Sequence, residues 1–150
     1  SFRGTPLYQA VAVGRVEGWS EDGRAAFDDQ LARDDFADAL KQTLSDYEIL
    51  APANSKPLFR LDARVADMET FQMGMDFTVQ SLITYRLRET ASNRVRMDET
   101  VRSSFTAGLG DAFVILLRKQ MANEGAVRES LAQAINRMKT IIAPQKDETE

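Results

Sequence analysis

The sequence contains no cysteine and no histidine. Their absence excludes disulfide bonds, thiol nucleophiles, Cys/His zinc sites and every Ser–His–Asp arrangement. No apolar run approaches the roughly 18 residues of a membrane-spanning helix, which excludes a membrane span.

The chain has 150 residues, of which 43% are hydrophobic and 28% charged. This balance is typical of one soluble globular domain. A domain of this length buries roughly 68–70% of its unfolded surface, so it needs no metal or disulfide to fold. We expect a single domain over residues 1–143 and a polar, disordered tail over residues 144–150.

Charge is unevenly distributed along the chain. The net charge is −4, but residues 17–48 hold ten acidic against three basic side chains, a balance of −7. Residues 54–106 hold eight basic against seven acidic side chains, a balance of +1. Because no segment has a large positive excess, the sequence predicts no nucleic-acid partner.

The first third of the chain predicts a strand followed by a helix. Residues 7–16 are rich in small and β-branched side chains, with both faces apolar, which indicates a strand covered on two sides or by a neighbouring subunit. Residues 17–24 contain two glycines and predict a loop. Residues 28–47 have apolar side chains at helical spacing and aspartates where a helix begins, and Pro52 and Pro57 bracket the loop that follows.

The middle of the chain predicts three strands with alternating faces. The first begins at Phe59, the second ends near Leu87, and Met73-Gly74 and residues 90–93 supply the turns between them. The side chains expected to point inward are Phe59, Leu61, Ala63 and Val65 in the first strand; Phe77, Val79, Ser81, Ile83, Tyr85 and Leu87 in the second; and Val95, Met97, Val101 and Phe105 in the third.

A long helix is expected after these strands, with Asp111 as its N-cap and Pro144 at its end. Gly125 interrupts its apolar stripe, and a glycine costs about 1 kcal/mol relative to alanine inside a helix. We predict one helix, with a kink at Gly125 left open. The order is then β-α-β-β-β-α. Because the last three strands have one polar face, both helices are expected on one face of a mixed, mostly antiparallel four-stranded sheet, an α+β fold.

Three features are weighed as catalytic or ligand sites, each against a structural explanation. The acidic group Asp28, Asp29, Asp34, Asp35 and Asp38 has oxygen ligands for a cation but lacks the calcium-loop spacing, so helix capping is favoured. Residues 108–110 (Gly-Leu-Gly) precede a helix, but lack the third glycine and the lysine of a phosphate loop. Glu99 lies on an apolar face, where burial raises the pKa of a carboxyl group, yet a hydrogen-bonded rim glutamate is favoured.

Two surfaces are predicted as candidates for interaction. Six arginines project from one face of the predicted sheet, and this face is expected to be solvated or to contact protein, since it lacks the aromatic side chains that stack on RNA bases. Apolar side chains near the N-terminus form a second candidate surface for a partner, although ordinary core packing is the favoured explanation for them. The arginines are Arg60, Arg64, Arg86, Arg88, Arg96 and Arg102; the N-terminal residues are Tyr8, Val11, Val13 and Trp19.

Several stretches together resemble a known group of proteins. Residues 7–16, the helix residues 36–44, the strand residues 79–87 and the run 122–131 resemble small bacterial envelope lipoproteins of the YajG and LptE-like kind, including a related alphaproteobacterial group. The resemblance implies a periplasm-facing domain that is tethered to a membrane by an acylated cysteine ahead of Ser1, a residue this chain lacks. It implies a binding or assembly role and supplies no catalytic residues.

The leading hypothesis is therefore a non-catalytic envelope protein that binds other envelope proteins or itself, with no cofactor and no metal. The alternative is a carrier for a lipid-like ligand, or an auxiliary component of a lipid transporter, with methionines as adaptable lining. An enzyme that uses only carboxylates is the third hypothesis. The methionines in question are Met68, Met73, Met75, Met97, Met121 and Met138.

Overall fold

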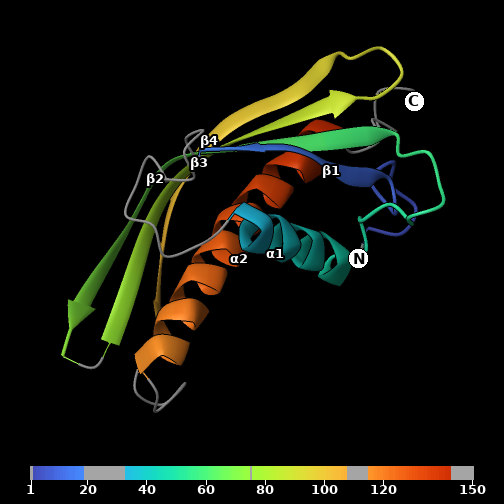
Figure 1. The fold of residues 1–150 in the computed structure, drawn as a ribbon. Coiled ribbons are helices and arrows are strands. Elements are labelled where there is room, and N and C mark those ends of the chain that lie inside the picture. Colours follow the sequence, from blue (N-terminus) through green and yellow to red (C-terminus); the bar gives the residue numbers. More distant parts are fainter. Residues whose placement is uncertain (1, 19–32, 75, 108–114, 143–150) are drawn as a thin grey trace.

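The computed structural model describes residues 2–18, 33–74, 76–107 and 115–142. In chain order the elements are β1 (Val11–Glu17), α1 (Arg33–Asp46), β2 (Phe59–Met73), β3 (Asp76–Glu89), β4 (Val95–Ala107) and α2 (Ile115–Ile142). The predicted order β-α-β-β-β-α and the α+β class are confirmed (Figure 1). The expected tail, residues 144–150, lies outside the described residues.

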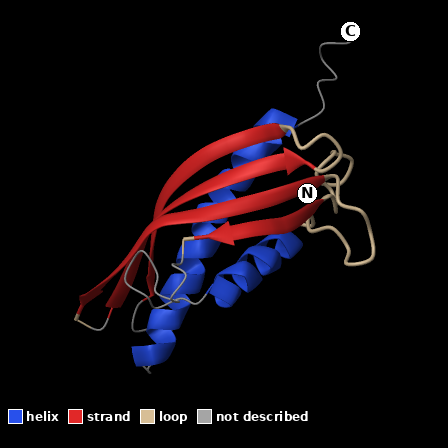
Figure 2. Ribbon diagram, turned by 45° about the horizontal axis from the view of Figure 1, so that its top comes forward, coloured by secondary structure: helices blue, strands red, loops and turns tan. Residues whose placement is uncertain are grey.

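The four strands form one mixed sheet in the order β1-β2-β3-β4. β1 runs parallel to β2, whereas β2–β3 and β3–β4 are antiparallel hairpins. α2 packs against β3 and β4, and α1 packs against β1 and α2. Both helices therefore lie on one side of the sheet, as predicted, and no described element covers the other side (Figure 2). We call that uncovered side the open face.

The core lies between the sheet and the two helices. Alternate strand residues point into it, and Leu61, Ile83 and Leu87 are fully buried there. Met97 and Met138 are buried in the same core, where they fill space between other apolar side chains. The helices contribute buried residues at helical spacing: Phe36, Leu40 and Leu44 from α1, and Val127, Leu131, Ala134, Ile135 and Met138 from α2.

The predicted first strand begins too early. Strand pairing starts at Val11, and residues 3–9 form turns in which Gly4 and Gln9 have positive φ. Leu7 is nevertheless buried, because the turn closed by the Ala10 N–H on the Leu7 carbonyl directs its side chain into the core. A buried turn and a buried strand give the same apolar pattern, so the sequence did not separate them.

The prediction that Val95 points inward is also wrong. The β3–β4 register shifts between Leu87, which pairs with Met97, and Arg88, which pairs with Val95. This bulge places an extra residue in β4 and reverses the alternation at its start. Val95 is consequently 42% exposed, whereas Met97 remains in the core.

α2 is one continuous helix across Gly125, as predicted. A β-carbon at Gly125 would lie 2.4 Å from the ring of Phe105 on β4. Glycine is therefore needed here for close approach of a ring rather than for a bend. The expected N-cap, Asp111, and Pro144 lie outside the described residues.

The core contains two buried hydroxyl pairs that cross between elements. Ser81 and Ser103 join β3 to β4, with 2.9 Å between their oxygens. Tyr85 and Ser130 join β3 to α2, again with 2.9 Å between oxygens, and both residues are fully buried. A buried hydroxyl without a partner costs about 1–3 kcal/mol, so the second pair fixes how α2 sits on the sheet.

Burial also makes Tyr85 a source of alkaline sensitivity. Removal from water raises the pKa of Tyr85 well above its usual value of 10.0, although the hydrogen bond with Ser130 opposes the shift. Because the folded state holds this proton more tightly than the unfolded state, folding stability falls as pH rises above the unfolded tyrosine pKa. One proton changes stability by about 1.4 kcal/mol per pH unit in that range.

We therefore expect Tyr85→Phe to cost about 1 kcal/mol near pH 8 through loss of the hydrogen bond. The difference from wild type should shrink or reverse by pH 11, because only the wild type retains the ionisable group. Urea unfolding at both pH values measures this. A constant difference across the pH range would contradict the assignment.

Candidate functional site: an arginine groove on the open sheet face

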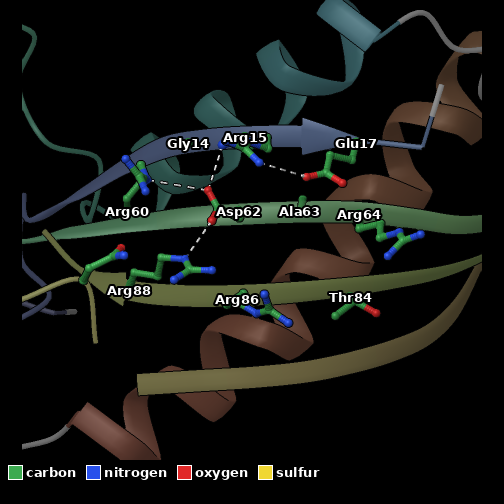
Figure 3. A pocket seen from close by; sticks show the side chains of 11 residues that line it. Gly14, Arg15, Glu17, Arg60, Asp62, Ala63, Arg64, Thr84, Arg86 and Arg88 are labelled. Atoms are coloured by element: carbon green, nitrogen blue, oxygen red, sulfur yellow. Dashed lines mark hydrogen bonds and ion pairs between the residues drawn. The ribbon is translucent and has the colours of Figure 1, made fainter. Parts of the chain in front are cut away.

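The open face carries a concavity of about 550 Å³ over β1, β2 and β3. Figure 3 shows its side chains standing on the strands with α2 behind them, on the far side of the sheet. We call this concavity the arginine groove. Its lining residues are Gly14, Arg15, Glu17, Arg60, Asp62, Ala63, Arg64, Thr84, Arg86, Arg88 and Asn93.

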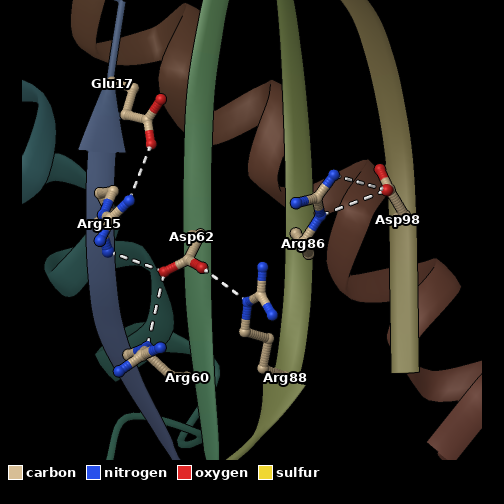
Figure 4. Close-up of polar contacts among 7 residues, drawn as sticks. All are labelled: Arg15, Glu17, Arg60, Asp62, Arg86, Arg88 and Asp98. Carbon is tan, nitrogen blue, oxygen red and sulfur yellow. Dashed lines mark hydrogen bonds and ion pairs between the residues drawn. The ribbon is translucent and has the colours of Figure 1, made fainter. Parts of the chain in front are cut away.

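The groove is organised around Asp62, whose carboxylate lies between β1 and β3 (Figure 4). The Arg15 backbone N–H donates to Asp62 Oδ1 at 2.8 Å. This contact exists because the β1 register shifts between Val13 and Val16, which frees the backbone between them from the ladder. Gly14 makes room for it, since a β-carbon there would lie 2.3 Å from the same oxygen.

Two arginines flank the Asp62 carboxylate from its own strand and from β3. Arg88 Nε lies 3.3 Å from Asp62 Oδ2, and Arg60 Nε lies 3.7 Å from Asp62 Oδ1. The Arg60 side chain is half-exposed, and such solvated pairs contribute at most about 1 kcal/mol. The Asp62 carboxylate thus sets the orientation of the Arg60 and Arg88 guanidinium groups, but it binds them only weakly.

The remaining arginines of the groove, Arg15, Arg64 and Arg86, are also exposed. Arg86 Nη2 lies 3.0 Å from Asp98 Oδ2 on β4, and Arg15 Nη1 lies 3.8 Å from Glu17 Oε1. Arg64 is exposed and has no ion pair among the described residues. Five arginines against two acidic lining residues give the groove a formal charge of +3. It can accept carboxylate or other anionic groups, to which guanidinium forks donate in pairs.

The structure brings together four of the six arginines predicted on this face, Arg60, Arg64, Arg86 and Arg88. The other two lie apart from the groove. Arg102 is exposed on β4, opposite Leu82. Arg96 forms an ion pair with Glu89 near the β3–β4 turn. The Ser92 hydroxyl, which donates to Glu89, and then Arg96 lower the pKa of that carboxyl group.

The N-terminal residues do not gather into one surface in the described structure. Val11 is fully buried in the core, so its side chain is not available to a partner. Val13 is partly buried against the core, and Tyr8 lies in the preceding turn with the Arg3 guanidinium 5.8 Å from its ring centre. Trp19 lies outside the described residues.

The structure describes part of the three features that were weighed as catalytic or ligand sites. Glu99 is a rim residue that accepts a hydrogen bond from Arg137 Nε of α2 at 2.7 Å, as the favoured explanation predicted. Asp34 and Asp35 lie in the first described turn of α1, and Asp38 is exposed further along that helix. Asp28, Asp29 and residues 108–110 lie outside the described residues. Within the described ranges, no group of three or more acidic residues is placed to hold a metal ion.

Sequence reasoning missed Gly14 and Asp62 as the organisers of the groove. The alternation of the strand that begins at Phe59 predicts only that Asp62 lies on its polar face, whereas the role of Asp62 depends on β1 and β2 lying side by side across 41 intervening residues. The signals available were a glycine inside a strand pattern, which often marks a bulge or a close approach, and an aspartate between two arginines.

The Asp62 arrangement gives a testable difference between two variants. Asp62→Ala should lower the free energy of unfolding by about 1 kcal/mol and speed hydrogen exchange at the Arg15 amide, because that N–H loses its acceptor. Asp62→Asn keeps an oxygen in place and should preserve much of the protection. Amide exchange measured by NMR separates the two; equal exchange rates in both variants and wild type would refute the contact.

Among the comparisons with known proteins, only the comparison with solved structures found matches. No family model matches the chain, and no curated protein sequence matches it. A candidate lipoprotein from Caulobacter crescentus CB15 matches with a TM-score of 0.63 and 13% identity over 90% of each chain. A Xanthomonas campestris protein of the family DUF330 matches with a TM-score of 0.61 and 14% identity over 99% of this chain and 93% of that one.

A third solved structure, PelC from Paraburkholderia phytofirmans, matches with a TM-score of 0.51 and 11% identity over 84% of this chain and 87% of that one. That protein was solved as a dodecamer. The chain shares the fold of these bacterial proteins. The predicted resemblance to a small lipoprotein is thereby supported at the level of the fold alone, and no comparison shows a specific YajG-like or LptE-like relationship. Neither helix, within the described residues, is long and apolar enough to cross a membrane.

Proposed function

We propose that this chain is the protein-binding domain of a bacterial envelope lipoprotein, without catalytic activity, and that the open sheet face is its docking surface. The observation that carries this proposal is the arginine groove. Five guanidinium groups stand on a sheet face that no described element covers, and their ion pairs within the described residues engage only a minority of their hydrogen-bond donors. The shared fold supports the envelope assignment.

The chemistry of the groove favours binding over reaction. Arginine is always protonated and donates hydrogen bonds without exchanging protons, so it recognises anionic groups but does not act as a general acid or base near neutral pH. Arginine is also enriched at the centres of protein interfaces. A partner surface with exposed carboxylates fits the formal charge of +3.

We further propose that the domain faces the periplasm and is held at a membrane by a lipidated cysteine encoded ahead of Ser1. The fold shared with a candidate lipoprotein supports this location. An assembly role through self-association or through another envelope protein is the finer part of the proposal. The dodecamer of PelC, a protein of similar fold, supports self-association as one form of it.

A position-specific crosslinking experiment tests the docking surface. A photoreactive amino acid is placed at Thr84 or Thr100 on the open face, and at Arg128 on the exposed side of α2 as the matched control. The full-length protein is then irradiated in the bacterium that encodes it. Protein crosslinks from Thr84 and Thr100, with few from Arg128, are expected. The absence of crosslinks from both open-face positions would overturn the proposal.

A further inference from the structure

Charge is segregated along the open face, with the change of sign at a bulge in β2. The β2–β3 register shifts between Val65 and Asp67, so Ala66 is an extra residue and the alternation of β2 reverses beyond it. Before the bulge, the even-numbered residues Arg60 and Arg64 lie on the open face. Beyond the bulge, the odd-numbered residues of β2 lie on the open face instead. Asp67 pairs with Leu82, and Leu82 points outward because its neighbour Ile83 points into the core.

The part of the open face beyond the bulge is acidic and partly apolar. We call it the acidic hairpin and define it as Asp67, Glu69, Phe71, Met73 and Asp76. All five residues are exposed; Phe71 is 44% and Met73 is 76% accessible. The three carboxylates have no ion pair among the described residues. Their formal charge of −3 matches the +3 of the arginine groove in magnitude and opposes it in sign.

Two neighbouring charges reduce both totals equally. Asp98 borders the groove and pairs with Arg86, whereas Arg102 lies across β3 from Asp67. With these included, the two halves of the face carry +2 and −2. The two totals therefore stay equal in magnitude and opposite in sign when the borders are widened to include Asp98 and Arg102.

We propose that the partner of the open face is a second copy of this chain, stacked open face to open face and antiparallel, so that each arginine groove meets the acidic hairpin of the other copy. This inference rests on the proposed function, which makes the open face a docking surface. A two-fold axis near the middle of the face creates both contacts at once, because a two-fold interface uses the same patch on both subunits. A parallel stack instead sets arginine against arginine.

The dimensions and the apolar residues of the face fit such a pair. Three strands of 13–15 residues, at about 3.3 Å per residue and about 4.8 Å apart, cover on the order of 650 Å² in projection. Stable interfaces bury about 800 Å² of accessible surface per partner, and accessible area exceeds projected area. Stacked twisted sheets cross at about 30°, which keeps the strands close to antiparallel along the face. Phe71 and Met73 then become buried against the opposite groove.

Charge reversal tests this pairing. Arg15→Glu/Arg64→Glu changes the groove from +3 to −1, so that both ends of the face are acidic, and Asp67→Lys/Glu69→Lys changes the hairpin from −3 to +1, so that both ends are basic. All four side chains are exposed, and among the described residues only Arg15 has an ion pair, a solvated one with Glu17, so both proteins should fold. We expect wild type to sediment at twice the monomer mass of 16.8 kDa at low salt and to dissociate as salt rises. Each variant alone should dimerise at least tenfold more weakly.

An equimolar mixture of the two variants gives the decisive result. In the mixed pair the altered groove of one copy (−1) meets the altered hairpin of the other (+1), and the two unaltered ends meet as −3 and +3, so dimerisation should return. Arg128→Glu on α2 serves as the control and should leave the dissociation constant unchanged. A wild-type protein that stays monomeric at 100 µM and low salt, or a mixture that fails to restore the dimer, would overturn the inference. If photocrosslinks from Thr84 then reach a different envelope protein, the proposed function stands without it.

Discussion

Replacing Ile83 with alanine is expected to lower the free energy of unfolding by about 2–5 kcal/mol, whereas Thr84→Ala, one residue along β3, should cost less than about 1 kcal/mol. Ile83 is fully buried beneath the helices. Thr84 lies on the open face, where its hydroxyl is 2.8 Å from that of Thr100. The pair of variants therefore compares the two sides of the sheet at nearly one position.

Urea unfolding with both variants measures the difference, and the slope of free energy against urea should be similar for each. A further pair tests the same asymmetry on β2, where Leu61 is fully buried and Arg64 is exposed. Leu61→Ala should cost about as much as Ile83→Ala, and Arg64→Ala should stay within about 0.5 kcal/mol of wild type. Similar costs on both sides would contradict a sheet covered on one side only.

The second large effect is expected at Gly125. In an exposed helix interior, alanine stabilises by about 1 kcal/mol relative to glycine. Here the added methyl group would lie 2.4 Å from two carbons of the Phe105 ring, which must move. Overpacking of this kind costs about 1–3 kcal/mol, so Gly125→Ala should destabilise the protein even though it improves helix propensity.

A double-mutant cycle isolates the cause. When Phe105 is already alanine, the ring is absent and Gly125→Ala should become stabilising by up to about 1 kcal/mol. The predicted sign therefore reverses between the two backgrounds, and the coupling appears directly in the cycle. If Gly125→Ala destabilises equally in both backgrounds, then contact with Phe105 is not the reason for the glycine.

The fold could be predicted from the sequence because its strongest signal is local. Alternation from Phe59 to Phe105 set the faces of three strands, and the helical spacing of Leu131, Ile135 and Met138 set the inward side of α2. The errors occurred at a bulge and at a buried turn, neither of which the local pattern of apolar residues reveals. The bulge beside Arg88 turned Val95 outward, and the turns of residues 3–9 buried Leu7 without a strand.

The site was predicted only in part, for a related reason. The face shared by Arg60, Arg64, Arg86 and Arg88 follows from alternation within each hairpin. The contact between the Arg15 amide and Asp62 does not, since it needs the parallel pairing of β1 with β2 and a bulge at Gly14. The bulge beside Ala66 was likewise hidden, and it is what places Asp67 and Glu69 on the same face as the groove.

Arginine footprinting with phenylglyoxal tests most directly whether the open face is the docking surface. Reactivity is measured by mass spectrometry for the dilute purified domain at high salt and for the full-length protein in intact envelopes. The account predicts that Arg64 and Arg86 are reactive in the first sample and protected in the second, whereas Arg128, on the exposed side of α2, reacts equally in both. Equal reactivity of Arg64 and Arg86 in the two samples would contradict it.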